Sequence, residues 1–130
     1  MVIADTSIWI DYFNGLINRE TNTLDQLIID GNVAMGDLIL LEILQGFRDD
    51  GDYARAKSSL TNLDQFDMFT QGMAVKCADN YRALRKKGIT IRKTSDVIIA
   101  SFCIENKLPL LFSDKDFLPF VKHLGLVSVL

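Results

Sequence analysis

The chain of 130 residues is the size of one domain and is too short for two independent cores. Its 48% hydrophobic and 24% charged residues exclude a disordered tail or a collagen-like rod, and no apolar run is long enough for a membrane-spanning helix. The acid at position 5 argues against a secretory signal, and the only cysteines, Cys77 and Cys103, lie in apolar segments. We therefore expect a cytoplasmic protein with two reduced core thiols.

The net charge of −3 argues against a generally basic nucleic-acid-binding protein. The charge is unevenly distributed, however. Residues 76–93 hold seven of the fourteen basic residues and one of the seventeen acids. This segment is therefore a basic patch in an otherwise acidic chain.

The first half of the chain alternates short apolar runs with helical patterns. Helices end at Asn14-Gly15 and at Gly31, and apolar residues at Leu24, Leu27 and Ile28 mark one helix face. In chain order, the pattern predicts a strand over 2–4, helices over 7–13 and 21–30, a strand over 32–36, helices over 37–46 and 53–63, and a strand over 66–69.

The second half continues this alternation. It predicts a helix over 71–87, a helix over 94–106, a strand over 108–112, a helix over 116–123 and a strand over 127–130. The buried stripe of the first of these helices is predicted to be Met73, Ala74, Cys77, Ala78, Tyr81 and Leu84. Strands that alternate with helices predict an α/β fold, here one domain over 1–130 with a parallel five-stranded sheet and helices on both faces.

Three acids follow strands or begin helices. Asp5 follows the first predicted strand, Asp114 follows the fourth, and Asp96 opens a helix. Ligands bind at the carboxyl ends of the strands in such a fold, so these acids are candidates for one site. Alternatively, each acid is only a helix cap or a first-turn acid that the helix dipole favours.

Glu42 is a charge in an almost wholly apolar helix. Burying it without a partner would cost several kcal/mol, and Arg48, the nearest basic residue, is not on its helix face. Two partners therefore remain, a distant basic residue or a metal ion. Four carboxylates at one edge would raise at least one pKa unless a cation lay among them. Because these candidates include no His or Cys, the ion would be Mg²⁺ or Mn²⁺, together with a phosphate-containing substrate.

Four segments, in this order, resemble the motifs of PIN-domain nucleases, and the resemblance covers nearly the whole chain. They are Val-Ile-Ala-Asp5-Thr6-Ser7, Leu-Glu42-Ile-Leu-Gln-Gly46, Ser95-Asp96-Val-Ile-Ile-Ala100 and Phe-Ser113-Asp114-Lys-Asp116-Phe117. The sequence is most similar to the VapC toxins of prokaryotic toxin–antitoxin pairs.

The resemblance implies a Mg²⁺- or Mn²⁺-dependent endoribonuclease. The catalytic and metal-binding acids that it implies are Asp5, Glu42, Asp96 and Asp114, with Asp116 as a less certain further ligand. Hydrogen bonds from Thr6 or Ser7, and from Ser113, would orient these carboxylates or a bound water. The family also implies an RNA substrate, a homodimer and inhibition by a VapB-type antitoxin that occupies a groove near the site.

Two surfaces have a second interpretation under this resemblance. Arg82, Lys86, Lys87, Arg92 and Lys93 are either a solvated surface or a track for RNA phosphates. The aromatic residues Trp9, Tyr12, Phe13 and Phe47 are expected in the core, and any that are exposed would form the antitoxin groove.

Two other functions remain open. A phosphatase-like α/β enzyme would use Asp5 as nucleophile, although Ser7 stands where such enzymes carry a second Asp. A non-catalytic PIN module would bind RNA or a protein without cleaving it. A Ser–His–Asp triad is excluded because His123, the only histidine, has no suitable neighbours in the sequence.

Overall fold

The centre of the computed structural model, which describes all residues 1–130, is a parallel sheet of four strands. The strands are β1 (Val2–Ala4), β2 (Val33–Gly36), β3 (Asp64–Phe66) and β4 (Leu110–Leu111), in the order β3-β2-β1-β4. All three neighbouring pairs are parallel, and Ile3 of β1 lies between Ala34 of β2 and Leu110 of β4. The carboxyl ends of the strands therefore lie at one edge, as predicted for an α/β fold.

The segment 127–130, predicted as a fifth strand, lies beside β4 but does not form a regular strand. This segment makes only an isolated parallel bridge between Leu110 and Ser128. Two backbone hydrogen bonds hold it there, from the Leu110 N–H to Val127 and from the Val129 N–H to Leu110. A regular strand would need a longer run of such bonds.

The third strand begins and ends earlier than the predicted 66–69. The chain leaves the sheet after Phe66, and the backbone N–H of Met68 donates to Oδ1 of Asp37 at 3.0 Å instead of to a neighbouring strand. Met68 is completely buried. The side chain of Asp37 therefore replaces a sheet hydrogen bond that the sequence pattern suggested.

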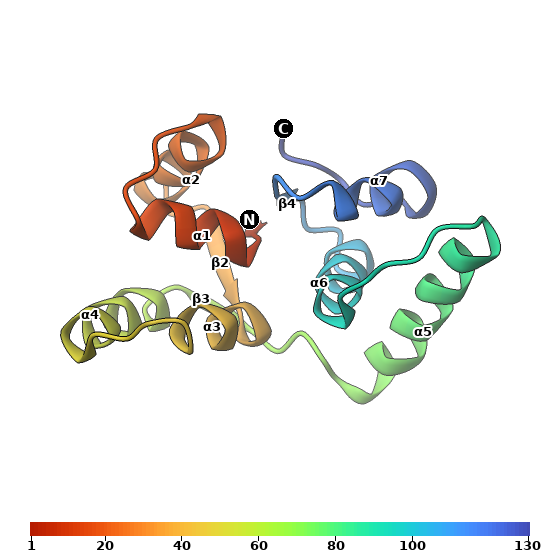
Figure 1. The fold of residues 1–130 in the computed structure, drawn as a ribbon, viewed down its shortest axis with the longest axis horizontal. Coiled ribbons are helices and arrows are strands. Elements are labelled where there is room, and N and C mark those ends of the chain that lie inside the picture. The colour runs from red at the N-terminus through yellow and green to blue at the C-terminus, as the bar shows by residue number, and fades with distance from the viewer.

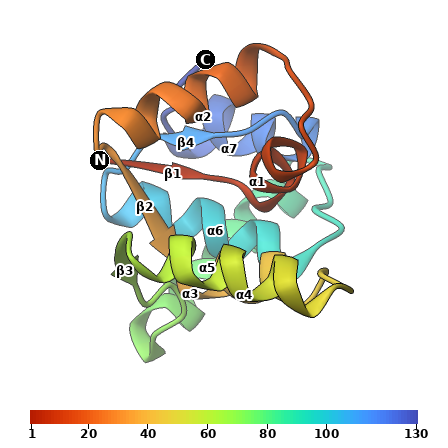
Figure 2. The same ribbon diagram turned by 90° about the vertical axis from the view of Figure 1, so that its left-hand side faces the viewer.

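Seven α-helices and one 3₁₀ turn surround the sheet. They are α1 (Thr6–Phe13), α2 (Arg19–Ile29), α3 (Asp37–Leu44), α4 (Asp50–Thr61), α5 (Gln71–Lys86), α6 (Thr94–Glu105), η1 (Lys115–Phe117) and α7 (Leu118–Leu124). Figure 1 shows α1 to α4 on the left and α5 to α7 on the right. In Figure 2, α2 lies above β1 and β4, α7 lies behind β4 at the same height, and α3, α4, α5 and α6 lie below the two strands. Helices thus cover both faces of the sheet, as predicted, and none is long and apolar enough to cross a membrane.

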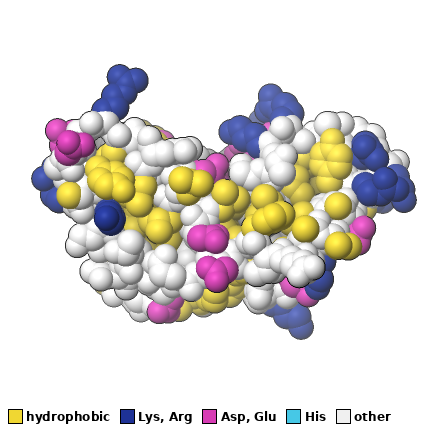
Figure 3. Space-filling model, turned by 90° about the horizontal axis from the view of Figure 1, so that it is seen from below, with side chains coloured by type: hydrophobic (Ala, Val, Ile, Leu, Met, Phe, Trp, Pro, Cys, Tyr) yellow, Lys and Arg dark blue, Asp and Glu magenta, His cyan; other side chains and the backbone are white.

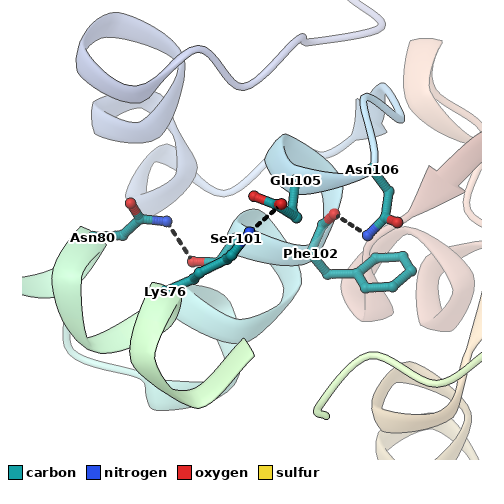
Figure 4. Close-up of polar contacts among 6 residues, drawn as sticks. All are labelled: Lys76, Asn80, Ser101, Phe102, Glu105 and Asn106. Atoms are coloured by element: carbon teal, nitrogen blue, oxygen red, sulfur yellow. Dashed lines mark hydrogen bonds and ion pairs between the residues drawn. The ribbon is translucent and has the colours of Figure 1, made fainter. Parts of the chain in front are cut away.

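Helix α5 is fixed to α6 by polar contacts as well as by packing (Figure 4). The side chains of Lys76 and Glu105 form an ion pair, and the Asn80 amide donates to the buried Ser101 hydroxyl at 2.9 Å. Cys77 and Cys103 are buried and free, as the sequence predicted. Helix α5 therefore has a fixed position relative to α6, which carries one of the candidate acids.

The buried stripe of α5 is narrower than its sequence pattern suggested. Met73, Cys77 and Leu84 are buried, and Tyr81 is half-buried. Ala74 and Ala78, the other members of the predicted stripe, are exposed. Because α5 packs chiefly on one helix, α6, a narrow apolar face is sufficient to hold it.

Candidate acidic metal site

The predicted acids meet where the carboxyl ends of the parallel strands lie. Asp5 directly follows β1, and Asp114 lies three residues after β4. Asp96 lies in the first turn of α6, and both Asp5 and Asp96 are only 6% exposed. Asp96, Asp114 and Asp116 each place one carboxylate oxygen within 4.8 Å of the others. The topology therefore brings together acids that are far apart in the sequence.

Electrostatic interactions join Asp5 and Glu42 to this group. The pKa of Asp96 is raised to about 6, chiefly by burial and then by the negative charges of Asp5, Asp114 and Glu42, while Lys93 lowers it. Burial also raises the pKa of Asp5, and Glu42 adds to that effect. Burial is the larger cause of both shifts, and the repulsion between carboxylates that the sequence predicted adds to it.

Hydroxyl groups at the start of α1 hold two of the carboxylates. Thr6 donates from Oγ1 to Oε1 of Glu42 at 2.7 Å, and Ser7 donates from Oγ to Oδ2 of Asp5 at 3.1 Å. Ser113 is exposed and makes no side-chain hydrogen bond. Glu42 forms no ion pair, so the alternative of a distant salt bridge to this residue is wrong.

Helix capping explains only part of the acidic group. Asp114 caps η1, because its Oδ1 accepts from the backbone N–H of Asp116 at 2.9 Å. Asp5 occupies the N-cap position of α1 but forms no side-chain capping bond. Oδ2 of Asp96 is buried without any hydrogen-bond partner. Capping therefore leaves the most buried acids unexplained.

The donor set fits a hard divalent cation. A buried carboxylate oxygen without a hydrogen bond is costly, and a cation would compensate both this oxygen and the repulsion between the acids. All the donors are carboxylate oxygens, which suit Mg²⁺ or Mn²⁺. The geometry can therefore hold such an ion through Asp96 and its acidic neighbours.

The basic residues divide into two groups. Nη2 of Arg92 lies 3.3 Å from Oδ2 of Asp116, and Lys93 affects the pKa of Asp96, so both belong to the acidic site. Arg82 and Lys86 on α5, and Lys87 directly after it, are exposed beside Asp79. Sequence reasoning did not find the Arg92–Asp116 pair, because 24 residues separate the two and no periodic pattern connects them.

An apolar groove lies between α1 and the end of α3. Ile10, Phe13, Ile43 and Phe47 line it, and Phe13 is 38% exposed. Trp9 is buried, and Tyr12 is half-buried and donates to Asp25 at 2.7 Å. Two of the four predicted aromatic residues thus belong to the packed interior, and the other two face the groove.

A second apolar groove lies between α5 and α6. It is lined by Phe69, Ala74, Cys77, Ala78, Tyr81, Ile91, Thr94, Val97 and Ile98. The sequence did not indicate it, since the alanines and Tyr81 were expected to face the core. Figure 3 shows regions of exposed hydrophobic side chains on both sides of the molecule, with acidic side chains between them.

This chain belongs to the PIN domain family, whose model matches residues 2–120. Among its relatives, Ribonuclease VapC11 of Mycobacterium tuberculosis is 28% identical over 119 residues, which are 90% of this chain and 89% of the relative. VapC ribonuclease Mb1587 of Mycobacterium bovis has the same identity and coverage.

Two solved structures share the fold. VapBC2 from Rickettsia felis, bound to a DNA fragment from its promoter, matches with a TM-score of 0.77 and 20% identity. A toxin–antitoxin complex from Klebsiella pneumoniae matches with a TM-score of 0.71 and 18% identity. Each match covers 98% of this chain and 97% of the other. The family that the four sequence motifs predicted is confirmed by the family model, and these two structures show the same fold.

Proposed function

We propose that this chain is a metal-dependent endoribonuclease and the toxin of a VapBC-type toxin–antitoxin pair. The observation that carries the proposal is the buried Asp96 oxygen without a hydrogen-bond partner among four further acids. The relatives named VapC ribonucleases support the same activity. The substrate would be RNA, and Mg²⁺ or Mn²⁺ would be the cofactor.

The acids would bind the metal ion, and the hydroxyl groups beside them would orient the acids. Asp5, Glu42, Asp96 and Asp114 would hold the ion, which when bound would activate water and stabilise charge on the phosphate. The hydroxyl of Thr6 keeps Glu42 directed toward the site. Such supporting hydrogen bonds orient metal ligands in proteins. No side-chain nucleophile is required.

The proposed activity is tested by sequencing RNA ends in cells after induction of the wild type and of Asp5→Asn. We expect new RNA ends only with the wild type. In vitro, EDTA should abolish cleavage and added Mn²⁺ should restore it. RNA that is bound with metal but left intact across a broad panel would support the non-catalytic alternative.

The phosphatase-like alternative has a separate test. Phosphate trapped covalently on Asp5 would support it. The structure gives this alternative little support, because Ser7, which stands where a second Asp would be needed, is instead a hydrogen-bond donor to Asp5. Membership of the PIN domain family also argues against it.

The protein partner would be a VapB-type antitoxin bound in the groove between α1 and α3. The exposed face of Phe13 and the lining residues Ile10 and Phe47 offer an apolar surface for such a segment. The two solved structures that share the fold, VapBC2 from Rickettsia felis and a toxin–antitoxin complex from Klebsiella pneumoniae, support a partner of this type. A Phe13→Glu variant should remain toxic when the antitoxin is co-expressed.

The homodimer and the cytoplasmic location are further parts of the proposal. The apolar groove between α5 and α6 is a surface that a second copy could cover, and Phe69 at its edge is 56% exposed. Sedimentation of the purified chain tests the dimer. A Phe69→Asp variant should then sediment as a monomer.

A further inference from the structure

Arg92 contacts the acidic site from the loop between α5 and α6. Its Nη2 lies 3.3 Å from Oδ2 of Asp116, and its side chain is 81% exposed. The preceding residue, Ile91, is buried, which anchors the loop at this point. The guanidinium is therefore held beside the acids while most of its surface faces solvent.

Asp116 is itself firmly placed. Its backbone N–H donates to Oδ1 of Asp114 at 2.9 Å, and the next residue, Phe117, is completely buried. Only 26% of the Asp116 side chain is exposed. One of its oxygens already accepts a hydrogen bond from Arg92. Asp116 is thus the one acid of the group that pairs with a basic side chain.

Stability does not account for this ion pair. Pairs with an exposed partner contribute little to folding, because water and salt screen them. A guanidinium that keeps free N–H groups is, in contrast, well suited to a phosphate, which it binds through two parallel hydrogen bonds. An RNA strand that approaches five carboxylates also needs positive charge nearby, and only Arg92 and Lys93 of the basic segment adjoin them.

We propose that Arg92 binds a backbone phosphate of the RNA at the acidic site, and that Asp116 is the positioning residue that directs Arg92 rather than a ligand of the metal ion. This inference rests on the proposed function, since it assigns roles within the same site. It divides the five acids into four that hold the ion and one that holds the arginine.

The first test measures the affinity of a short fluorescent single-stranded RNA by anisotropy in EDTA, where cleavage does not interfere. Arg92→Ala should weaken binding about tenfold and lower the salt dependence by about one phosphate contact. Arg92→Lys, which keeps the charge without the planar fork, should recover part of the affinity. Loss of binding no greater than in the control, or no RNA binding by the wild type, would overturn the inference.

The matched control is Arg55→Ala. Arg55 forms an exposed ion pair with Asp52 on α4, so its removal also breaks an exposed Arg–Asp pair, but one away from the acids. Binding by this variant should equal that of the wild type. Thermal melts of all variants should coincide, since both arginines are exposed.

The second test separates the two roles of the acids by titrating Mn²⁺ calorimetrically. Asp116→Asn should retain the metal affinity within about threefold, whereas Asp96→Asn should lose it by about tenfold or more. Asp116→Asn should weaken RNA binding when it is introduced into the wild type. It should cause no further loss of RNA binding when it is introduced into Arg92→Ala. Loss of Mn²⁺ binding by Asp116→Asn would show a ligand and overturn the assignment.

These measurements fail separately from the proposed function. If the wild type binds RNA through Arg92 but never cleaves it, the ribonuclease proposal fails and the role of Arg92 stands. If the wild type cleaves RNA while Arg92→Ala binds as the wild type does, only the role of Arg92 fails.

Discussion

Asp96 is the residue at which burial of the acidic site most reduces the stability of the fold. Burial, together with the charges of Asp5 and Asp114, raises its pKa from 3.8 to about 6. At a pH between these two pKa values, the folded state binds more protons than the unfolded state. The free energy of unfolding therefore falls as the pH rises through this range, and it stays lower at higher pH. The pKa of Asp5 is raised as well. We expect the metal-free protein to be more stable near pH 4.5 than near pH 7 by about 1 to 2 kcal/mol.

Asp96→Asn should remove most of this dependence. In EDTA at neutral pH, the variant should gain about 1 to 2 kcal/mol in the free energy of unfolding, because no buried charge remains at this position. Urea denaturation at several pH values measures both effects. Equal pH dependence in the wild type and the variant would assign the effect to another group. Added Mn²⁺ should stabilise the wild type and not the variant.

Thr6 is the residue whose side chain connects β1's end to α3. Thr6→Val keeps the shape but removes the hydrogen bond to Glu42, so kcat should fall about tenfold while the melting temperature changes little. Steady-state cleavage of a defined RNA measures this. Thr6→Ser, which retains the hydroxyl, should keep most of the activity. Full activity in Thr6→Val would show that Glu42 needs no such support.

At the scale of elements, Gly36 lets β2 and the chain after β3 approach closely. A Cβ at this position would lie 2.2 Å from Sδ of Met68, which is completely buried. Gly36→Ala should therefore destabilise the fold by about 1 to 3 kcal/mol, measured by urea denaturation. The added cost should shrink when Met68 is first shortened by Met68→Ala. An equal cost in both backgrounds would exclude this contact as the cause.

The elements themselves were largely predictable, because apolar periodicity and glycine positions determine where helices begin and end. The errors have physical causes. The pattern at 66–69 is apolar enough for a strand, but the side chain of Asp37 accepts the hydrogen bond from the Met68 N–H. At 127–130 the sequence favours a strand, and only one bridge to Leu110 forms. Such competition depends on tertiary contacts that a local pattern does not contain.

At the scale of the whole molecule, the basic face of α5 should add non-specific affinity for RNA. Lys86 and Lys87 are exposed there. Changing both to alanine should weaken RNA binding and lower its salt dependence by about one to two phosphate contacts. Lys57→Ala on α4 is the control and should bind as the wild type does. Unchanged salt dependence in the double variant would mean that this face is only solvated.

The acidic group could be anticipated from the sequence because parallel topology places the residues after β1 and β4 at one edge. The assignment of Glu42 needed its apolar helix as a signal, since an unpaired charge there requires an explanation. The contact of Arg92 with Asp116 could not be foreseen. It depends on how a loop returns over the sheet edge, which neither spacing nor composition encodes.

The order in which the acids occur along the chain also has a consequence for synthesis. Strand β4 and the turn after it come late in the sequence, and Asp114 lies beyond them. A growing polypeptide therefore exposes Asp5, Glu42 and Asp96 without the last member of the set. On the proposed function, a cell making this protein would be protected from partial products, because the acidic site is complete only after residues 110–117 have been translated and have docked beside β1.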